Sequence, residues 1–176
     1  MTSSRKPGWV VWVTGAPSSG KSTLARAVKR RLDSEGRPCA LLDGDEVRAA
    51  LVPRPGYAPK ARAAFYETLA GLAALLARQG LLVLVAATAN RRVYRERARK
   101  LSPRYLEVFV DTPPEVCARR DAKGLYALAR SGLAPHLPGA GTAYERPSSP
   151  DVIATGGRDG RAAAAVVELS RRRRRG

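Results

Sequence analysis

The sequence predicts an α/β domain in which a parallel sheet carries helices on both faces. Short apolar runs of strand length alternate along the 176 residues with longer segments whose apolar side chains recur at helical spacing. The strand-like runs are apolar at successive positions, as expected for parallel strands that are buried on both faces. A glycine-rich turn follows the first run, and ligands of such sheets bind beyond the carboxyl ends of the strands.

The first half of the chain contains three predicted strands. Residues 9–14 form a continuous β-branched and aromatic run that stops at the glycine-rich turn. A helix is predicted over residues 21–32, because apolar residues recur there at helical spacing. Residues 39–42 are the second predicted strand. An alanine- and leucine-rich helix follows over residues 59–79, and residues 81–87 form the third strand.

The second half continues this alternation. Residues 91–101 have a strongly basic helical pattern, and residues 105–111 are the fourth predicted strand. A short last strand over residues 151–155 precedes a helix over residues 159–170. The segment 122–147 is rich in Gly, Pro and Ala and is too long for a tight connection. Because loops of that length are usually functional, we expect this segment to be a lid over the site.

The composition fits one globular domain that needs neither disulfide bonds nor a structural metal. Hydrophobic residues make up 44% of the chain, enough for a core. We expect a single domain over residues 1–176, with a flexible N-terminus at 1–7 and a basic tail at 171–176. Cys39 and Cys117 form no CxxC pair, and the chain has one histidine, so a zinc site would lack ligands.

The chain is strongly basic, with 32 Lys and Arg against 15 Asp and Glu and a formal net charge of +17. Such a balance favours polyanionic partners in general. Arg171–Arg175 form one run of charge, which we interpret as a solvated tail, and no nucleic-acid module is recognisable. The first apolar run is too short to span a membrane and no export signal follows it, so we expect a cytoplasmic protein.

The sequence GAPSSGKS lies between a predicted strand and a predicted helix and fits the phosphate-binding pattern G-x-x-x-x-G-K-[ST]. In such a P-loop, backbone N–H groups and the helix N-terminus surround the phosphate oxygens of a nucleoside triphosphate. Lys21 would reach the β- and γ-phosphates, and Ser22 would bind Mg²⁺. The residues predicted to hold the triphosphate are Gly15, Ala16, Pro17, Ser18, Ser19, Gly20, Lys21, Ser22 and Thr23.

Carboxylates for catalysis are predicted at the end of the second strand. A P-loop kinase needs an acidic residue near Mg²⁺ and a group that orients or deprotonates the acceptor hydroxyl. The third strand ends in AATAN without an acid, so Asp43 and Asp45 are the candidates. The alternative interpretation is a turn with an aspartate helix cap, since Asp45 and Glu46 precede a short helical segment. One residue can serve both roles.

Three further segments stand out beyond this motif: LLDGDEVR (41–48), VFVDTPPEVCARRDAKGLYALARSG (108–132) and AYERPSSPDVIATG (143–156). From Trp12 to Thr155, the chain resembles the adenylylsulfate (APS) kinases, a family of P-loop kinases, through these segments. They are similar to the family's DGD-x-x-R, FVDTP-x-x-V-C-x-x-RD-x-KGLY-x-x-AR and Y-E-x-P-x-x-P-D segments. The resemblance implies a P-loop NTPase-type fold and transfer of the γ-phosphoryl group of MgATP to the 3′-hydroxyl of adenylylsulfate. The family is commonly dimeric, which implies a homodimer.

The same resemblance implies roles for individual residues. Asp45 would lie near the attacking hydroxyl and the metal, and Lys21 and Asp43 would support the transfer. Arg48 and Arg62 would face the charged phosphosulfate of the acceptor, because a guanidinium group binds such anions with two parallel hydrogen bonds. The other residues implied to lie near the nucleotide or the acceptor are Tyr57, Asn90, Arg120, Lys123 and Leu137.

The chain departs from the family pattern where the acceptor would bind. Ala61 and Phe65 replace the acid and the asparagine of G-F-S-x-x-D-R-x-x-N. Thr88–Arg92 reads TANRR in place of F-I-S-P-Y-R, and Leu137 replaces an aromatic residue. These changes leave open a P-loop kinase with another small nucleotide acceptor, such as a pyrimidine diphosphate derivative. A nucleotide-dependent protein that binds polyanions, tightly only at low salt, is the second alternative.

Overall fold

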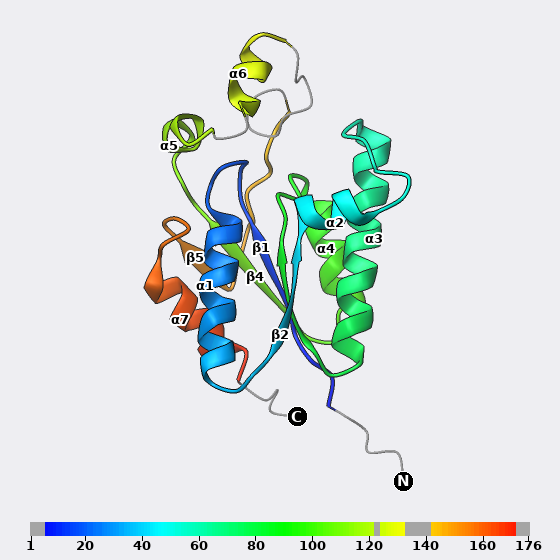
Figure 1. Cartoon of the computed structure of the whole chain (residues 1–176), viewed down its shortest axis with the longest axis vertical. Coiled ribbons are helices and arrows are strands. Elements are labelled where there is room, and N and C mark those ends of the chain that lie inside the picture. The colour runs from blue at the N-terminus through cyan, green and yellow to red at the C-terminus, as the bar shows by residue number, and fades with distance from the viewer. Residues whose placement is uncertain (1–5, 122–123, 133–141, 172–176) are drawn as a thin grey trace.

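The computed structural model describes residues 6–121, 124–132 and 142–171 (Figure 1). Strands and helices alternate along these residues, as the sequence predicts. The strands are β1 (Val10–Thr14), β2 (Cys39–Asp43), β3 (Leu82–Ala86), β4 (Tyr105–Val110) and β5 (Val152–Ala154). The helices are α1 (Lys21–Ser34), α2 (Gly44–Ala50), α3 (Pro59–Arg78), α4 (Arg92–Leu101), α5 (Pro114–Arg119), α6 (Leu125–Arg130) and α7 (Gly160–Leu169).

The strands form one parallel sheet in the order β2-β3-β1-β4-β5. β1 is the central strand, and its Val11 pairs with Leu84 of β3 on one side and with Leu106 of β4 on the other. Parallel neighbours require crossover connections, and the helices supply them. The predicted fold class, a parallel sheet with helices on both faces, is confirmed.

Successive side chains of a strand point to opposite sides of the sheet. Because the strand residues are mostly apolar at successive positions, both faces of the sheet are apolar. On one face, Val13 lies in a core cluster with Leu24 of α1 and Val166 of α7. On the other face, the fully buried Trp12 lies in a second cluster with Leu69 of α3. Figure 1 shows α1 and α7 on one side of the sheet and α2, α3 and α4 on the other. The continuous apolar runs in the sequence thus reflect burial on two faces.

The carboxyl ends of the strands lie at the upper edge of the sheet in Figure 1, where the loop after β1 and the start of α2 are found. The helices α5 and α6 lie above this edge. Of the lid predicted over 122–147, the structure describes residues 124–132, which include α6, and residues 142–147. Residues 122–123 and 133–141 lie outside the described part. No helix in the described part is long and apolar enough to cross a membrane.

The described chain ends at the first residue of the predicted basic tail. Arg171 forms ion pairs with Glu35 and with Glu168, the latter at 3.0 Å. This arginine is therefore held against α1 and α7, and residues 172–176 lie outside the described part of the chain.

Candidate active site

The loop between β1 and α1 forms a cradle of backbone N–H groups at a helix N-terminus. Gly20 precedes α1 with a left-handed φ of 103°, and a Cβ atom there would lie 2.7 Å from the backbone of Gly157. Both constraints require glycine. The Nζ of Lys21 donates a hydrogen bond to the carbonyl oxygen of Ala16 at 2.7 Å, which folds the ammonium group back over the loop. This combination of N–H groups, helix dipole and ammonium charge fits a triphosphate.

Asp43 ends β2 beside the phosphate loop and is only 6% exposed. Its Oδ2 accepts a hydrogen bond from the Oγ of Ser22. Its Oδ1 accepts one from the backbone N–H of Asp45 at 3.0 Å, so Asp43 is also the N-cap of α2. The residue that caps α2 is therefore also the residue that contacts Ser22 of the phosphate loop.

The Ser22 hydroxyl and the Asp43 carboxylate supply oxygen donors of the kind that Mg²⁺ prefers. Mg²⁺ usually takes one or two such protein groups and completes its coordination with phosphate oxygens and water, so these residues fit the metal. Ser22 and Asp45 are the ligands predicted from the sequence. Asp45 lies exposed in the first turn of α2, and the carboxylate that the structure brings to Ser22 is that of Asp43.

The two arginines expected to face the acceptor are both buried. Arg48 on α2 is 4% exposed and Arg62 on α3 is 7% exposed. The Nη1 of Arg48 donates hydrogen bonds to both carbonyl oxygens of residues 55–56. Tyr57 follows this loop, and its ring centroid lies 4.6 Å from the guanidinium carbon of Arg48. Because Asp45 and Arg48 are three residues apart on α2, one helix carries the candidate base and the candidate acceptor arginine.

Asn90 lies in the loop after β3, and its side chain contacts the C-terminal end of the predicted lid. Its Nδ2 donates a hydrogen bond to the carbonyl oxygen of Ala143 at 3.1 Å, and its backbone carbonyl oxygen accepts one from the backbone N–H of Glu145 at 2.7 Å. The hydroxyl of Tyr144 shares a hydrogen bond with Thr14 at 2.9 Å, and burial raises the pKa of Tyr144 to about 12. Asn90 thus anchors the end of the lid, and its predicted contact with the acceptor stays a prediction.

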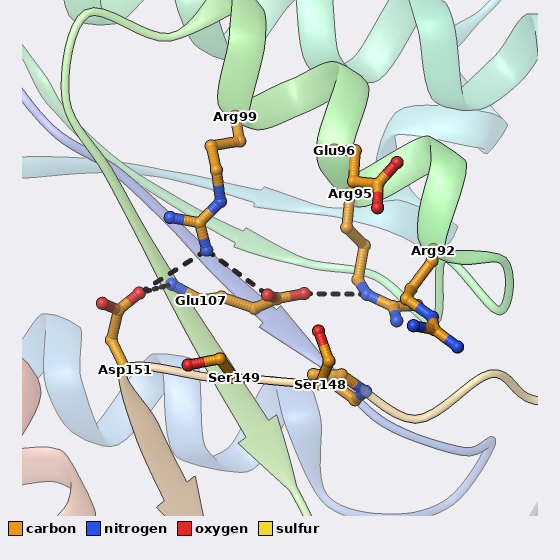
Figure 2. Close-up of a pocket in the computed structure, with 9 residues that line it drawn as sticks. Arg92, Arg95, Glu96, Arg99, Glu107, Ser148, Ser149 and Asp151 are labelled. Atoms are coloured by element: carbon orange, nitrogen blue, oxygen red, sulfur yellow. Dashed lines mark hydrogen bonds and ion pairs between the residues drawn. The ribbon is translucent and has the colours of Figure 1, made fainter.

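Arg95, which the sequence analysis did not single out, ties the same segment to the sheet. It is 2% exposed, and its Nε donates a hydrogen bond to Oε1 of Glu107 at 2.8 Å (Figure 2). Its two Nη groups donate to the carbonyl oxygens of Ala89 and Glu145. The sequence did contain a signal for this cluster, because Glu107 is a lone acid within an apolar strand run.

A pocket of about 370 Å³ lies between α4 and residues 147–151, beside this cluster (Figure 2). Glu107 and Asp151 project toward Arg99 from the opposite wall, at 3.4 and 3.8 Å. The backbone N–H of Glu107 also donates a hydrogen bond to Asp151 at 2.7 Å. The arginines of α4 therefore pair with the acids on the opposite wall. These ion pairs connect α4 with β4 and with Asp151.

Replacing Arg95 with alanine is expected to lower the free energy of unfolding by about 3–5 kcal/mol, because the buried Glu107 would lose its nearest partner and keep only the half-exposed Arg99. Urea-induced unfolding measures this change. The matched control is Arg97→Ala on the same helix, whose pair with Glu67 is half-exposed and is expected to contribute about 1 kcal/mol or less. Equal losses in the two variants would contradict the anchoring role of Arg95.

α6 belongs to the predicted lid and contacts the phosphate loop. The hydroxyl of Tyr126 donates a hydrogen bond to the carbonyl oxygen of Pro17 at 2.9 Å. Burial raises the pKa of Tyr126 to about 12, so this donor keeps its proton at neutral pH. The backbone N–H of Tyr126 in turn bonds the carboxylate of Asp121 at 2.8 Å. The start of the lid is thus fixed directly to the loop that would hold the triphosphate.

The remaining predicted residues lie on or near the lid. Arg120 is the exposed C-cap of α5 and lies in the connection between α5 and α6. Lys123 and Leu137 lie outside the described residues. Their predicted contacts with the nucleotide and the acceptor therefore stay predictions.

Comparison with known proteins agrees with this geometry. The sequence model of the adenylylsulphate kinase family matches residues 7–155. An adenylyl-sulfate kinase of Synechococcus sp. is 41% identical over 146 residues, which cover 83% of each chain. An adenylyl-sulfate kinase of Burkholderia ambifaria is 43% identical over 150 residues, covering 84% of this chain and 83% of that protein.

Among solved structures, the APS kinase CysC of Mycobacterium tuberculosis in complex with AMPPNP and APS superimposes with a TM-score of 0.87. The two chains are 38% identical, and the match covers 94% of this chain and 99% of that one. The family model spans most of the chain, from the segment before β1 through β5, and the fold agrees over nearly the whole length. This chain therefore belongs to the adenylylsulphate kinase family.

Proposed function

We propose that this chain transfers the γ-phosphoryl group of MgATP to the 3′-hydroxyl of adenylylsulfate, giving 3′-phosphoadenylylsulfate and ADP. The observation that carries the proposal is the proximity of three parts at one edge of the sheet. These are the phosphate loop, the Asp43–Asp45 turn and the buried Arg48. Support comes from the Mycobacterium tuberculosis relative, whose structure holds both an ATP analogue and APS.

The donor side of the reaction rests on α1 and β2. The P-loop N–H groups and Lys21 bind the β- and γ-phosphates, and Ser22 and Asp43 hold the metal. When bound, Mg²⁺ neutralises part of the charge on the transferring group. As the bond between the acceptor 3′-oxygen and the γ-phosphorus forms, the bond from that phosphorus to the β–γ bridging oxygen breaks. The hydroxyl proton passes to the carboxylate of Asp45.

The acceptor side rests on α2, α3 and the lid. Arg48 and Arg62 bind the anionic phosphosulfate group, and the exposed ring of Tyr57 contacts the base. The lid helix α6, held to the phosphate loop through Tyr126, covers the site and limits transfer to water.

The experiment that tests this function is an ADP-release assay with MgATP and a panel of acceptors, compared by kcat/KM. The panel contains adenylylsulfate, cytidine and uridine diphosphate derivatives, and a reaction without acceptor. A clear preference for adenylylsulfate is expected. Preference for a pyrimidine nucleotide would instead assign the departures at Phe65 and Leu137 to a change of specificity. No turnover with any acceptor would favour the polyanion-binding alternative.

We further propose a homodimer that works in the cytoplasm, on the support of the family resemblance. Size-exclusion chromatography with light scattering is expected to give twice the mass of one chain. A monomeric mass across the working concentration range would contradict the dimer.

A further inference from the structure

Arg48 is a buried cation whose charge is not neutralised by a contacting carboxylate. Its hydrogen bonds go to the neutral carbonyl oxygens of Pro55 and Gly56, at 3.1 and 2.8 Å. No ion pair joins it to an acid within the described residues. Burial is the largest influence on the Arg48 guanidinium and lowers its pKa. The positive charge of Arg62 lowers this pKa further, whereas Tyr57, Tyr66 and the Asp45 carboxylate on the same helix raise it. A buried charge in such surroundings is costly unless an anion completes its environment.

Two aromatic rings contact the Arg48 guanidinium and stabilise its positive charge. The guanidinium carbon of Arg48 lies over the ring of Phe65, 3.8 Å from its centroid, and over the ring of Tyr57 at 4.6 Å. Both distances are within the range of cation–π attraction, which is strongest where water is excluded. The two rings differ in exposure, since Phe65 is 3% exposed and Tyr57 is 53% exposed.

Phe65 is the fixed member of this pair. It lies on α3 inside the core cluster that also holds Leu69, and its ring packs against Tyr66 with centroids 5.4 Å apart. A ring held on its inner side by the core cannot follow a moving guanidinium, so it defines where that group rests. Tyr57, in contrast, is on the solvent side and can move with a ligand. Position 65 is also where the resembled family has asparagine.

We propose that Phe65 is a positioning residue of the acceptor site, whose ring holds the Arg48 guanidinium in place for the anionic group of the acceptor. This inference rests on the proposed kinase function. A guanidinium that is already held in its binding position loses less side-chain entropy when it binds an anion, so the binding is tighter. In the interactions that the structure gives, this pair of side chains does not contact the phosphate loop or Asp43, so the effect is expected on acceptor binding and not on ATP binding.

The test compares Phe65→Leu, which removes the ring but keeps an apolar side chain, with Phe65→Tyr, which keeps the ring. Phe65→Leu is expected to raise the KM for adenylylsulfate about three- to tenfold, in keeping with cation–π strengths, and to leave the KM for ATP unchanged. Phe65→Tyr is expected to retain a KM for adenylylsulfate close to that of the wild type. An unchanged KM in Phe65→Leu would overturn the proposal.

A second measurement asks whether Phe65 acts through Arg48. In an Arg48→Lys background the planar guanidinium is gone, so adding Phe65→Leu is expected to raise the acceptor KM less than about twofold further. The same fold-change in both backgrounds would overturn the proposal, because the ring would then act independently of Arg48.

The matched control is Leu69→Ala, a cavity-forming change one turn along α3 in the same core cluster. It is expected to lower the urea midpoint of unfolding with no change in the acceptor KM. A rise in acceptor KM equal to that of Phe65→Leu would reduce Phe65 to a general structural role. Absence of wild-type turnover with adenylylsulfate would instead overturn the proposed function itself, so the two failures are distinguishable.

Discussion

Replacing Lys21 with alanine is expected to reduce kcat about 10²- to 10³-fold, because the variant loses a positive charge aimed at the group that becomes more negative in the transition state. The position of Nζ above the phosphate loop, 2.7 Å from the carbonyl oxygen of Ala16, places that charge in advance. Steady-state ADP release with saturating MgATP and acceptor measures the change. The far-ultraviolet circular dichroism spectrum checks that the variant is folded.

The control for this experiment is Lys29→Ala, which removes the same charge two turns further along α1. Lys29 pairs with Asp33 at 3.0 Å and lies away from the loop. This variant is expected to keep the wild-type kcat. If Lys21→Ala also kept it, the assignment of the phosphate loop as the ATP site would be wrong.

Replacing Asp45 with asparagine is expected to lower kcat about 10²- to 10⁴-fold, the usual range for loss of a general base. The dissociation constant for ATP is expected to stay close to that of the wild type, because the carboxylate that contacts Ser22, and that we propose to hold the metal, is that of Asp43. The backbone N–H of residue 45 still donates to Asp43, so the start of α2 is retained. Calorimetric titration with ATP and ADP-release kinetics together separate the two effects.

The neighbouring Glu46→Gln is the matched control, since Glu46 is exposed and pairs with Arg26 at 3.3 Å. It removes one negative charge from the same turn and is expected to leave kcat unchanged. Unaltered turnover in Asp45→Asn would contradict the assignment of the base and would move that role to Asp43.

The sequence was sufficient to predict the fold because the sheet is buried on both faces. Continuous apolar runs such as residues 9–14, when they alternate with helical segments, are typical of parallel strands that helices cover on two sides. The phosphate loop was equally predictable, because its geometry depends on local features such as Gly20, where the backbone requires a glycine.

The parts that sequence reasoning missed all depend on contacts between distant segments. Arg95 is one of many arginines in a basic helix, and nothing local marks it as the buried partner of Glu107 and of the C-terminal end of the lid. Likewise, the pattern around Asp43 predicts either a cap or a metal contact, and only the approach of α1 shows that the residue that caps α2 also contacts Ser22 of the phosphate loop. Arg48 was expected at the acceptor, but its enclosure by Phe65 depends on how α3 packs against α2.

The central place of β1 in the sheet also determines when this protein can acquire its ATP site during folding. Val10 pairs with Val83 on one side and with Tyr105 on the other. The strand that leads into the phosphate loop therefore cannot complete its backbone pairing until these later segments have been synthesised. Such long-range pairing is slow, because a large loop must close before any contact compensates for the lost entropy. On the ribosome, the loop that binds nucleotide is therefore made before β3 and β4 and becomes functional only after both strands have been made.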